Sequence, residues 1–133
     1  MEEIAVCVET EINLTESEEK VKIAVANLFG NVPAEIKPSY KGSVLSAEAK
    51  GQEALVKLRN LLRSDRIRDA ARKALFEGML GQTISFCLNK QVAFAGHVSF
   101  SGEVAESPLG PIRITIECEN PRQLIDWLAP RTA

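Results

Sequence analysis

The sequence has few of the residues that usually mark a catalytic or metal site. Its 133 residues include one histidine, His97, and three cysteines, no two of which stand at the spacing of metal ligands. It has no glycine-rich phosphate loop, and no apolar run approaches the roughly 20 residues that a membrane helix needs. We therefore expect no enzyme, no catalytic residue, no metal or other cofactor, and no membrane contact.

Aromatic residues are also scarce, with five Phe, one Tyr and one Trp. Proteins that bind single-stranded nucleic acid stack the bases on exposed aromatic side chains. Only Tyr40 and Phe76 fall at positions where exposure is expected. The sequence therefore argues against a base-stacking platform and against strong sequence specificity.

The remaining composition is that of an ordinary globular protein, with 45% hydrophobic and 26% charged residues. A chain of this length predicts a single domain, residues 1–133. The N-terminal Met-Glu-Glu lacks the basic and apolar regions of a signal peptide, and three scattered cysteines fit a reducing compartment. We expect a cytoplasmic protein.

Hydrophobic periodicity predicts both strands and helices. The predicted strands span 4–12, 34–40 (broken at Pro38), 43–50, 83–88, 97–101 and 112–118. Helices are predicted between Thr15 and Gly30, over 52–62, from Ser64 to Gly78, and from Asn120 to Pro130. Residues 92–95 are compatible with strand or helix, and 102–111 is predicted to be an exposed loop.

Several polar residues are typical of helix starts. Thr15 and Glu18 have the spacing of a capping box, and Ser64 is a candidate N-cap with Asp65 behind it. Asn120 followed by Pro121 marks the last helix. Pro38 indicates an edge strand or a strand end. The order of elements predicts an α+β, two-layer sandwich: a mostly antiparallel sheet with helices packed on one face.

Charge is unevenly distributed along a chain whose net charge is only −2. Residues 1–19 contain seven acids and no Lys or Arg, whereas residues 50–73 contain eight bases against three acids. A basic face within an acidic protein is compatible with contact to a phosphate backbone. The alternative is a solvated helix surface with internal salt bridges.

The basic helix supplies the first candidate contacts, Arg66, Arg68, Arg72 and Lys73. Arg68 and Arg72 stand one helical turn apart, so they can straddle phosphates, and a guanidinium can bind a phosphate through two hydrogen bonds. In the alternative interpretation, nearby Asp65 and Asp69 neutralise part of this row.

The polar segment Asn89, Lys90 and Gln91 supplies the second group of candidates. Its amides can bond base edges or sugar hydroxyls, and Lys90 can bind phosphate. In the alternative interpretation this is a polar strand end whose amides satisfy buried backbone groups.

The chain resembles a family of small, uncharacterised archaeal proteins that are described as predicted RNA-binding. The resemblance covers nearly the whole chain and is carried by 88–93 (Leu-Asn-Lys-Gln-Val-Ala), Gly96, Phe100, 107–112 (Ser-Pro-Leu-Gly-Pro-Ile) and 66–72 (Arg-Ile-Arg-Asp-Ala-Ala-Arg). It implies a fold like that of the large-subunit ribosomal protein that binds 5S rRNA. It also implies RNA as partner, with a proposed link to the archaeal exosome or ribosome-related proteins.

The leading hypothesis is a non-catalytic RNA-binding module that contacts mainly the phosphate backbone. The alternative is a protein-interaction or assembly module, either a homo-oligomer or a subunit of a larger complex, in which an exposed sheet edge would favour pairing between copies. The two are distinguished by whether the arginines converge on one open surface or are paired within the fold.

Overall fold

A computed structural model describes residues 3–40, 42–101 and 110–131 of the chain. In chain order its elements are β1 (Ala5–Asn13), α1 (Glu18–Phe29), β2 (Ala34–Ser39), β3 (Gly42–Lys50), the 3-10 helix η1 (Gln52–Leu55), α2 (Val56–Ser64), α3 (Arg68–Glu77), β4 (Met79–Leu80), β5 (Thr83–Asn89), α4 (Lys90–Phe94), β6 (Phe100–Ser101), β7 (Pro111–Glu117) and α5 (Pro121–Leu128).

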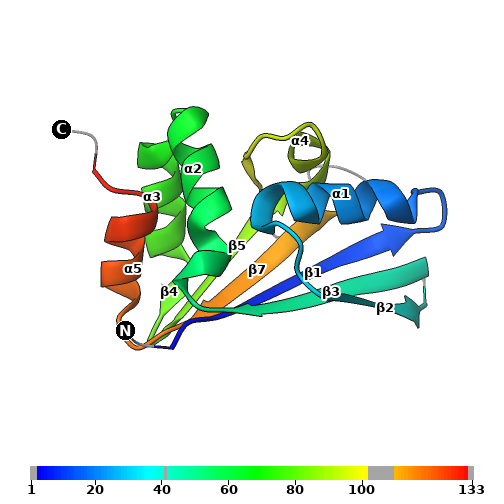
Figure 1. Cartoon of the computed structure of the whole chain (residues 1–133), viewed down its shortest axis with the longest axis horizontal. Coiled ribbons are helices and arrows are strands. Elements are labelled where there is room, and N and C mark those ends of the chain that lie inside the picture. Colours follow the sequence, from blue (N-terminus) through cyan, green and yellow to red (C-terminus); the bar gives the residue numbers. More distant parts are fainter. Residues whose placement is uncertain (1–2, 41, 102–109, 132–133) are drawn as a thin grey trace.

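The strands form one sheet in the order β2-β3-β1-β7-β5-β4, with β6 paired to β5. Every pairing in it is antiparallel. The helices lie on one face of the sheet, with α1 and α4 toward one end and α2, α3 and α5 toward the other (Figure 1). The predicted α+β sandwich is confirmed. Within the described ranges, no helix is long and apolar enough to cross a membrane.

The core lies between the sheet and the helices, and the alternation in the sequence explains its sheet side. Val6 and Val8 of β1 face inward beside Ile114 and Ile116 of β7. Leu28, Leu58, Leu62, Leu75 and Ile125 cover them from the helices. Burying one such side chain contributes about 1.5–3 kcal/mol, so this apolar face accounts for most of the stabilisation.

The predicted capping box at Thr15 is wrong. The first helix begins at Glu18, and Ser17 is its N-cap, accepting a hydrogen bond from the backbone N–H of Lys20. Glu16 is drawn into contacts with Asn13 and Lys90 instead. The turn after β1 therefore extends two residues further than predicted, so the helix cap is Ser17 and not Thr15. The predicted end at Gly30 is confirmed, with φ of 80°.

The predicted N-cap at Ser64 is also wrong. Ser64 is the last residue of α2, and α3 begins at Arg68 without a side-chain cap. The Asp65 carboxylate is directed toward the chain after α4, so it is not available to cap α3.

The remaining differences concern short segments. Residues 92–94 belong to helix α4, and the strand predicted over 97–101 is reduced to Phe100–Ser101. Most of the predicted loop, 102–109, lies outside the described residues. Pro38 lies in β2, at the edge of the sheet, as expected. Asn120 caps α5, and Pro121 occupies its first turn.

Candidate nucleic-acid interface

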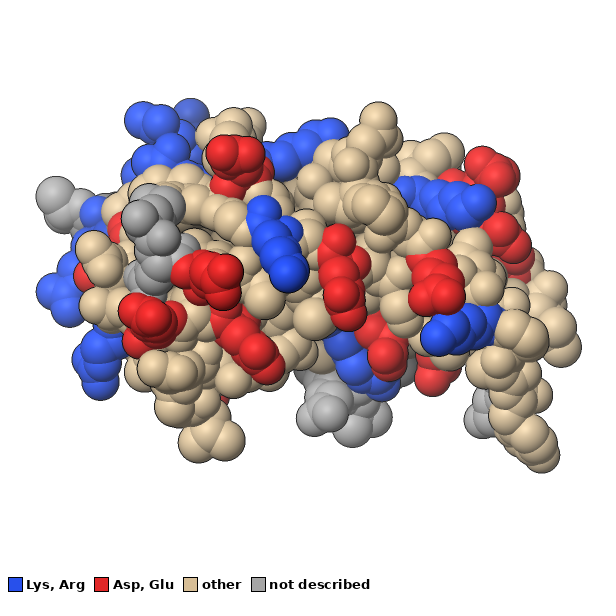
Figure 2. All heavy atoms as spheres, turned by 60° about the horizontal axis from the view of Figure 1, so that its bottom comes forward, with Lys and Arg blue, Asp and Glu red and all other residues tan. Residues whose placement is uncertain are grey.

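Basic side chains gather at the end of the molecule where α2, α3 and α5 pack together. Figure 2 shows Lys and Arg along this end, whereas Asp and Glu dominate the middle of the face that it displays. The turn between α2 and α3 carries Arg63, Arg66 and Arg68 within six residues, and Lys73 follows on α3. We call these four residues the basic surface.

Helix α3 turns Ala71 and Leu75 toward the core and leaves Lys73 on the outside. Ala71 and Leu75 are fully buried. Lys73 is exposed and Arg68 is half-buried at the border of the buried face. Arg63, Arg66, Arg68 and Lys73 form no ion pair with any residue that the structure describes. This part of the predicted interface is an open surface of positive charge.

Arg72 is engaged within the fold. Its guanidinium lies 2.7 Å from the Asp126 carboxylate, donates to the Ala129 carbonyl at 3.3 Å and stacks on the Phe76 ring. Only 16% of its side chain is exposed. Arg72 therefore joins α3 to α5.

Arg59 makes the same kind of link from α2. Its Nε donates to the Trp127 carbonyl at 2.9 Å, and its guanidinium lies over the indole ring. With Arg72, it places two cations at the C-terminal end of α5, where the helix dipole is negative and carbonyls lack helical partners. The positive charge of the 50–73 segment is thus divided between stabilising α5 and forming an open surface.

Phe76 is half-buried and lies between two guanidinium groups. The Arg72 guanidinium is 5.0 Å from the ring centroid, and that of Arg122 is 5.9 Å away. Both cations fall within the range of cation–π attraction. The ring expected to be exposed therefore holds arginines in place, and it offers little free face for a base.

The α2–α3 turn is anchored to the segment after α4. Asp65 accepts from the Val98 backbone N–H at 2.8 Å, and its other oxygen lies 3.0 Å from Nδ1 of His97. Burial alone would raise the pKa of Asp65, but these hydrogen bonds outweigh it and lower the pKa below its usual value. Arg66 follows with a φ of 57°, so the turn presents it outward in a left-handed conformation.

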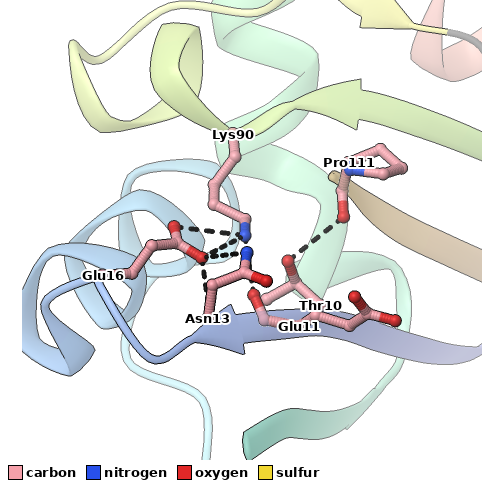
Figure 3. A network of polar contacts seen from close by, with 6 residues as sticks. All are labelled: Thr10, Glu11, Asn13, Glu16, Lys90 and Pro111. Carbon is pink, nitrogen blue, oxygen red and sulfur yellow. Dashed lines mark hydrogen bonds and ion pairs between the residues drawn. The ribbon is translucent and has the colours of Figure 1, made fainter. Parts of the chain in front are cut away.

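Lys90 is the first residue of α4, and its side chain points inward, toward the end of β1 and Glu16 in the turn before α1 (Figure 3). Its side chain is 4% exposed, and its Nζ donates to the Glu11 carbonyl at 2.6 Å and to Glu16 at 3.0 Å. A buried ammonium is tolerated only when paired and hydrogen-bonded, which is the case here. A phosphate could reach Lys90 only if this network opened.

Glu16 is the counterpart of Lys90, and the sequence pattern had placed it in the first helix. Its Oε1 also accepts from the backbone N–H and the side-chain amide of Asn13, both at 2.9 Å. Burial alone would raise the pKa of Glu16, but the Asn13 and Lys90 contacts outweigh it and lower the pKa. The separation of 74 residues from Lys90 explains why no local pattern indicated the pair.

The neighbours of Lys90 have separate roles. The Asn89 side chain accepts from the Val92 N–H at 3.0 Å and so caps α4. Gln91, the next residue of this short helix, is exposed. Within the Asn-Lys-Gln segment, Gln91 is therefore the side chain that an RNA could reach directly.

The outer face of the sheet is acidic. The strand registers place Glu9 and Glu11 of β1, Glu48 of β3 and Glu117 of β7 on it, and Glu9 stands opposite Arg113 of β7. Burial raises the pKa of Cys7 on this face, and the charges of Glu48 and Glu117 raise it further. Sheet-type RNA-binding domains stack bases on aromatic residues of an open face. This face carries no aromatic residue in β1, β3, β5 or β7, and its charge repels phosphate.

Comparison with known proteins shows the family of the chain and agrees with its fold. A family model described as RNA binding matches residues 5–118. A UPF0201 protein of Pyrobaculum calidifontis is 46% identical over 123 residues, which are 92% of this chain and 86% of the relative. The chain belongs to the UPF0201 family. The UPF0201 protein of Sulfurisphaera tokodaii is 44% identical over 128 residues, covering 96% of this chain and 88% of that protein.

A solved UPF0201 structure confirms the architecture. The crystal structure of the protein from Methanococcus jannaschii has a TM-score of 0.86 and 30% sequence identity, and the match covers 95% of this chain and 99% of that one. The family identified from sequence is therefore correct at the level of small archaeal UPF0201 proteins.

Among the described residues, no three His, Cys, Asp or Glu side chains are placed to hold a metal ion.

Proposed function

We propose that this UPF0201 protein is a non-catalytic RNA-binding module that binds the phosphate backbone through its basic surface. One observation carries the proposal: Arg63, Arg66 and Arg68 lie in or beside a single anchored turn, Lys73 follows on α3, and none of the four has an ion pair among the described residues. The match to an RNA-binding family model supports it.

The arrangement suits phosphates better than bases. Arginine can bind a phosphate through two parallel hydrogen bonds, and each neutralised phosphate releases condensed counterions. The contacts of Asp65 with His97 and Val98 fix the turn, so the arginines that flank it are held near the geometry in which they bind. Binding should therefore be strongly salt-dependent.

Structured RNA is the better target. Among the described aromatics, Phe76 is covered by guanidinium groups and Tyr40 lies in the hairpin between β2 and β3. Phe94 of α4 is 42% exposed, and the Lys20 ammonium lies over its ring. Stacking of successive unpaired bases has no platform at the basic surface, whereas a duplex backbone offers phosphates at regular spacing. The association with exosome or ribosome-related proteins that the resemblance implies stays a prediction.

The interface is smaller than the sequence predicted. Arg72 and Lys90 are omitted because their charged groups are engaged inside the fold, and Asn89 is omitted because it caps α4. Gln91 remains a candidate contact for an RNA that extends beyond the basic surface.

The test is a titration of a structured RNA by fluorescence anisotropy at several salt concentrations. The wild type is compared with an Arg68→Glu/Lys73→Glu variant. Each lost phosphate contact removes about 0.7–0.9 from the slope of log affinity against log salt, so the variant should show a slope that is shallower by roughly 1.5.

A Lys20→Glu/Lys50→Glu variant is the matched control, because it changes the net charge equally at exposed positions outside the basic surface. Its slope should equal that of the wild type. Equal losses in both variants would mean that only the total charge matters, and no binding at low salt would reject the function for the isolated protein.

A further inference from the structure

Strand β2 at the edge of the sheet has two chemically distinct rows. Ala34, Ile36 and Pro38 stand opposite Ala47, Leu45 and Ser43 of β3, so they share the side of the sheet that faces the helices. Glu35 and Lys37 alternate with them on the outer side. They are both well exposed, and their charged atoms lie 3.7 Å apart.

The outer edge of β2 keeps unused backbone groups. Proline cannot donate to the ladder, so Pro38 fits an edge strand when its nitrogen faces away from β3. Because backbone directions alternate along a strand, the N–H and C=O groups of Ala34 and Ile36 then face away as well. The Ala34 and Ile36 groups can pair with another strand, whereas Pro38 has no N–H to donate to it.

We propose that this edge pairs with β2 of a second copy of the chain, antiparallel and about a two-fold axis at Ile36. The sequence of β2 is self-complementary in that register. Glu35 of each copy stands opposite Lys37 of the other, and Ile36 stands opposite its own equivalent. Opposite charges directly across an antiparallel pair are stabilising, and a two-fold contact uses the same patch on both copies.

A groove beside the edge provides the apolar part of the contact. A cavity of about 360 Å³ between α1 and β2 is lined by Ile23, Val32, Ala34 and Leu45, and Ile23 is 46% exposed. In the proposed register, Pro38 of the second copy lies opposite Ala34, at this groove.

The side chain of Tyr40 from the second copy is the proposed occupant of this groove. Its side chain is 99% exposed, an unusual position for an aromatic residue. Tyr40 begins the turn that follows Ser39, so in the second copy it stands at the end of the strand pair where Val32 of the first copy lines the groove. The paired charges, the free edge and the exposed ring therefore indicate the same partner, another copy of this chain.

Lysine and proline on an edge strand often serve to prevent pairing. Here Glu35 and Lys37 have opposite signs and stand symmetrically about Ile36, so they repel a partner in other registers and attract it in this one. The dimer extends the sheet on the side away from α2 and α3 (Figure 1), so it leaves both basic surfaces open. Dimerisation and RNA binding can then be tested independently.

The test is sedimentation velocity of the full chain over a wide concentration range. The wild type should form a concentration-dependent dimer. Glu35→Lys alone and Lys37→Glu alone each oppose like charges at both ends of the strand pair, and each should weaken the dimer by about tenfold or more. The double swap Glu35→Lys/Lys37→Glu restores both pairs and should restore dimerisation.

Mixing the two single variants sharpens the test, because their heterodimer has complementary charges at both ends while either homodimer does not. The mixture should dimerise more strongly than either variant alone. Tyr40→Ala should also weaken the wild-type dimer without changing the circular dichroism spectrum. Glu48→Lys and Lys50→Glu on β3 are the charge-matched controls and should leave the dimer intact.

Two results would overturn the proposal. One is a wild type that stays monomeric up to millimolar concentration, which would mean that the edge charges only protect the strand. The other is a dimer that neither single charge reversal weakens, which would place its interface elsewhere.

Discussion

Lys90 and the basic surface contain the same kind of charge in opposite surroundings. Lys90 is 4% exposed and bonds to Glu16 and to the Glu11 carbonyl. Arg66 and Lys73 are exposed and have no ion pair among the described residues. A buried cation stabilises the fold through its hydrogen bonds and ion pairs, and separating it from these partners is costly. An exposed cation without such partners is available to a ligand. The difference predicts that stability and RNA binding will be affected by different residues.

The largest expected effect is on stability and comes from Lys90→Ala. The substitution leaves the Glu16 carboxylate buried without its cation, and breaking a buried pair in this way costs about 3–5 kcal/mol. Lys73→Ala, the exposed control, should change the free energy of unfolding by no more than about 0.5 kcal/mol. Urea denaturation measures both, and equal values would remove the distinction between the two surroundings.

Arg72→Ala should have the next largest effect. It removes the charged contacts with Asp126 and the Ala129 carbonyl, and hydrogen bonds to charged groups contribute about 1.5–3 kcal/mol. Arg63→Ala on the neighbouring helix is the control and should leave the unfolding midpoint nearly unchanged, while the RNA affinity should fall more for Arg63→Ala. The opposite order would show that Arg72, and not the basic surface, meets the RNA.

Acid should weaken both the buried network around Glu16 and the Asp65 contacts that anchor the α2–α3 turn. The pKa values of Glu16 and Asp65 are lowered in the folded protein, so their stabilisation is complete above their ordinary pKa values and is lost as the pH falls through the folded values. Glu16→Gln should flatten the decline in unfolding temperature at acidic pH and lower that temperature at neutral pH. Glu77→Gln, at an exposed position, should retain the wild-type pH profile.

The smallest effect is expected on the outer face of the sheet. If RNA binds at the basic surface, removing acid there with Glu9→Gln/Glu48→Gln changes only the long-range repulsion, which is largely screened beyond about 8–10 Å at physiological salt. Affinity for RNA should rise only slightly. A large gain would mean that the sheet face lies within the interface.

Local patterns in the sequence predicted much of the fold. The alternation of apolar and polar residues located β1 and β7, because one side of each strand is buried and the other faces solvent. Gly30 and the Asn120–Pro121 pair marked helix boundaries, because their backbone and capping preferences are local.

The prediction failed where a distant residue competes for a side chain. Glu16, expected in the first turn of the helix, bonds instead to Lys90, 74 residues away, and the helix that was to begin at Thr15 is capped by Ser17. Asp65 leaves the expected helix start for Val98, 33 residues away. Contacts between residues far apart in the sequence also decide which cations of the candidate site are engaged and which stay open. The segment 50–73 is basic, but only contacts with α5 reveal that Arg59 and Arg72 are engaged while the cations around the α2–α3 turn stay open.

The most direct test of the central claim is a map of amide chemical shifts during titration of isotope-labelled protein with a structured RNA. Binding at the basic surface predicts perturbations that are concentrated between Arg63 and Lys73, with Glu16 and the outer face of β1 and β3 unchanged. Perturbations centred on the sheet face, with the α2–α3 turn unaffected, would contradict it.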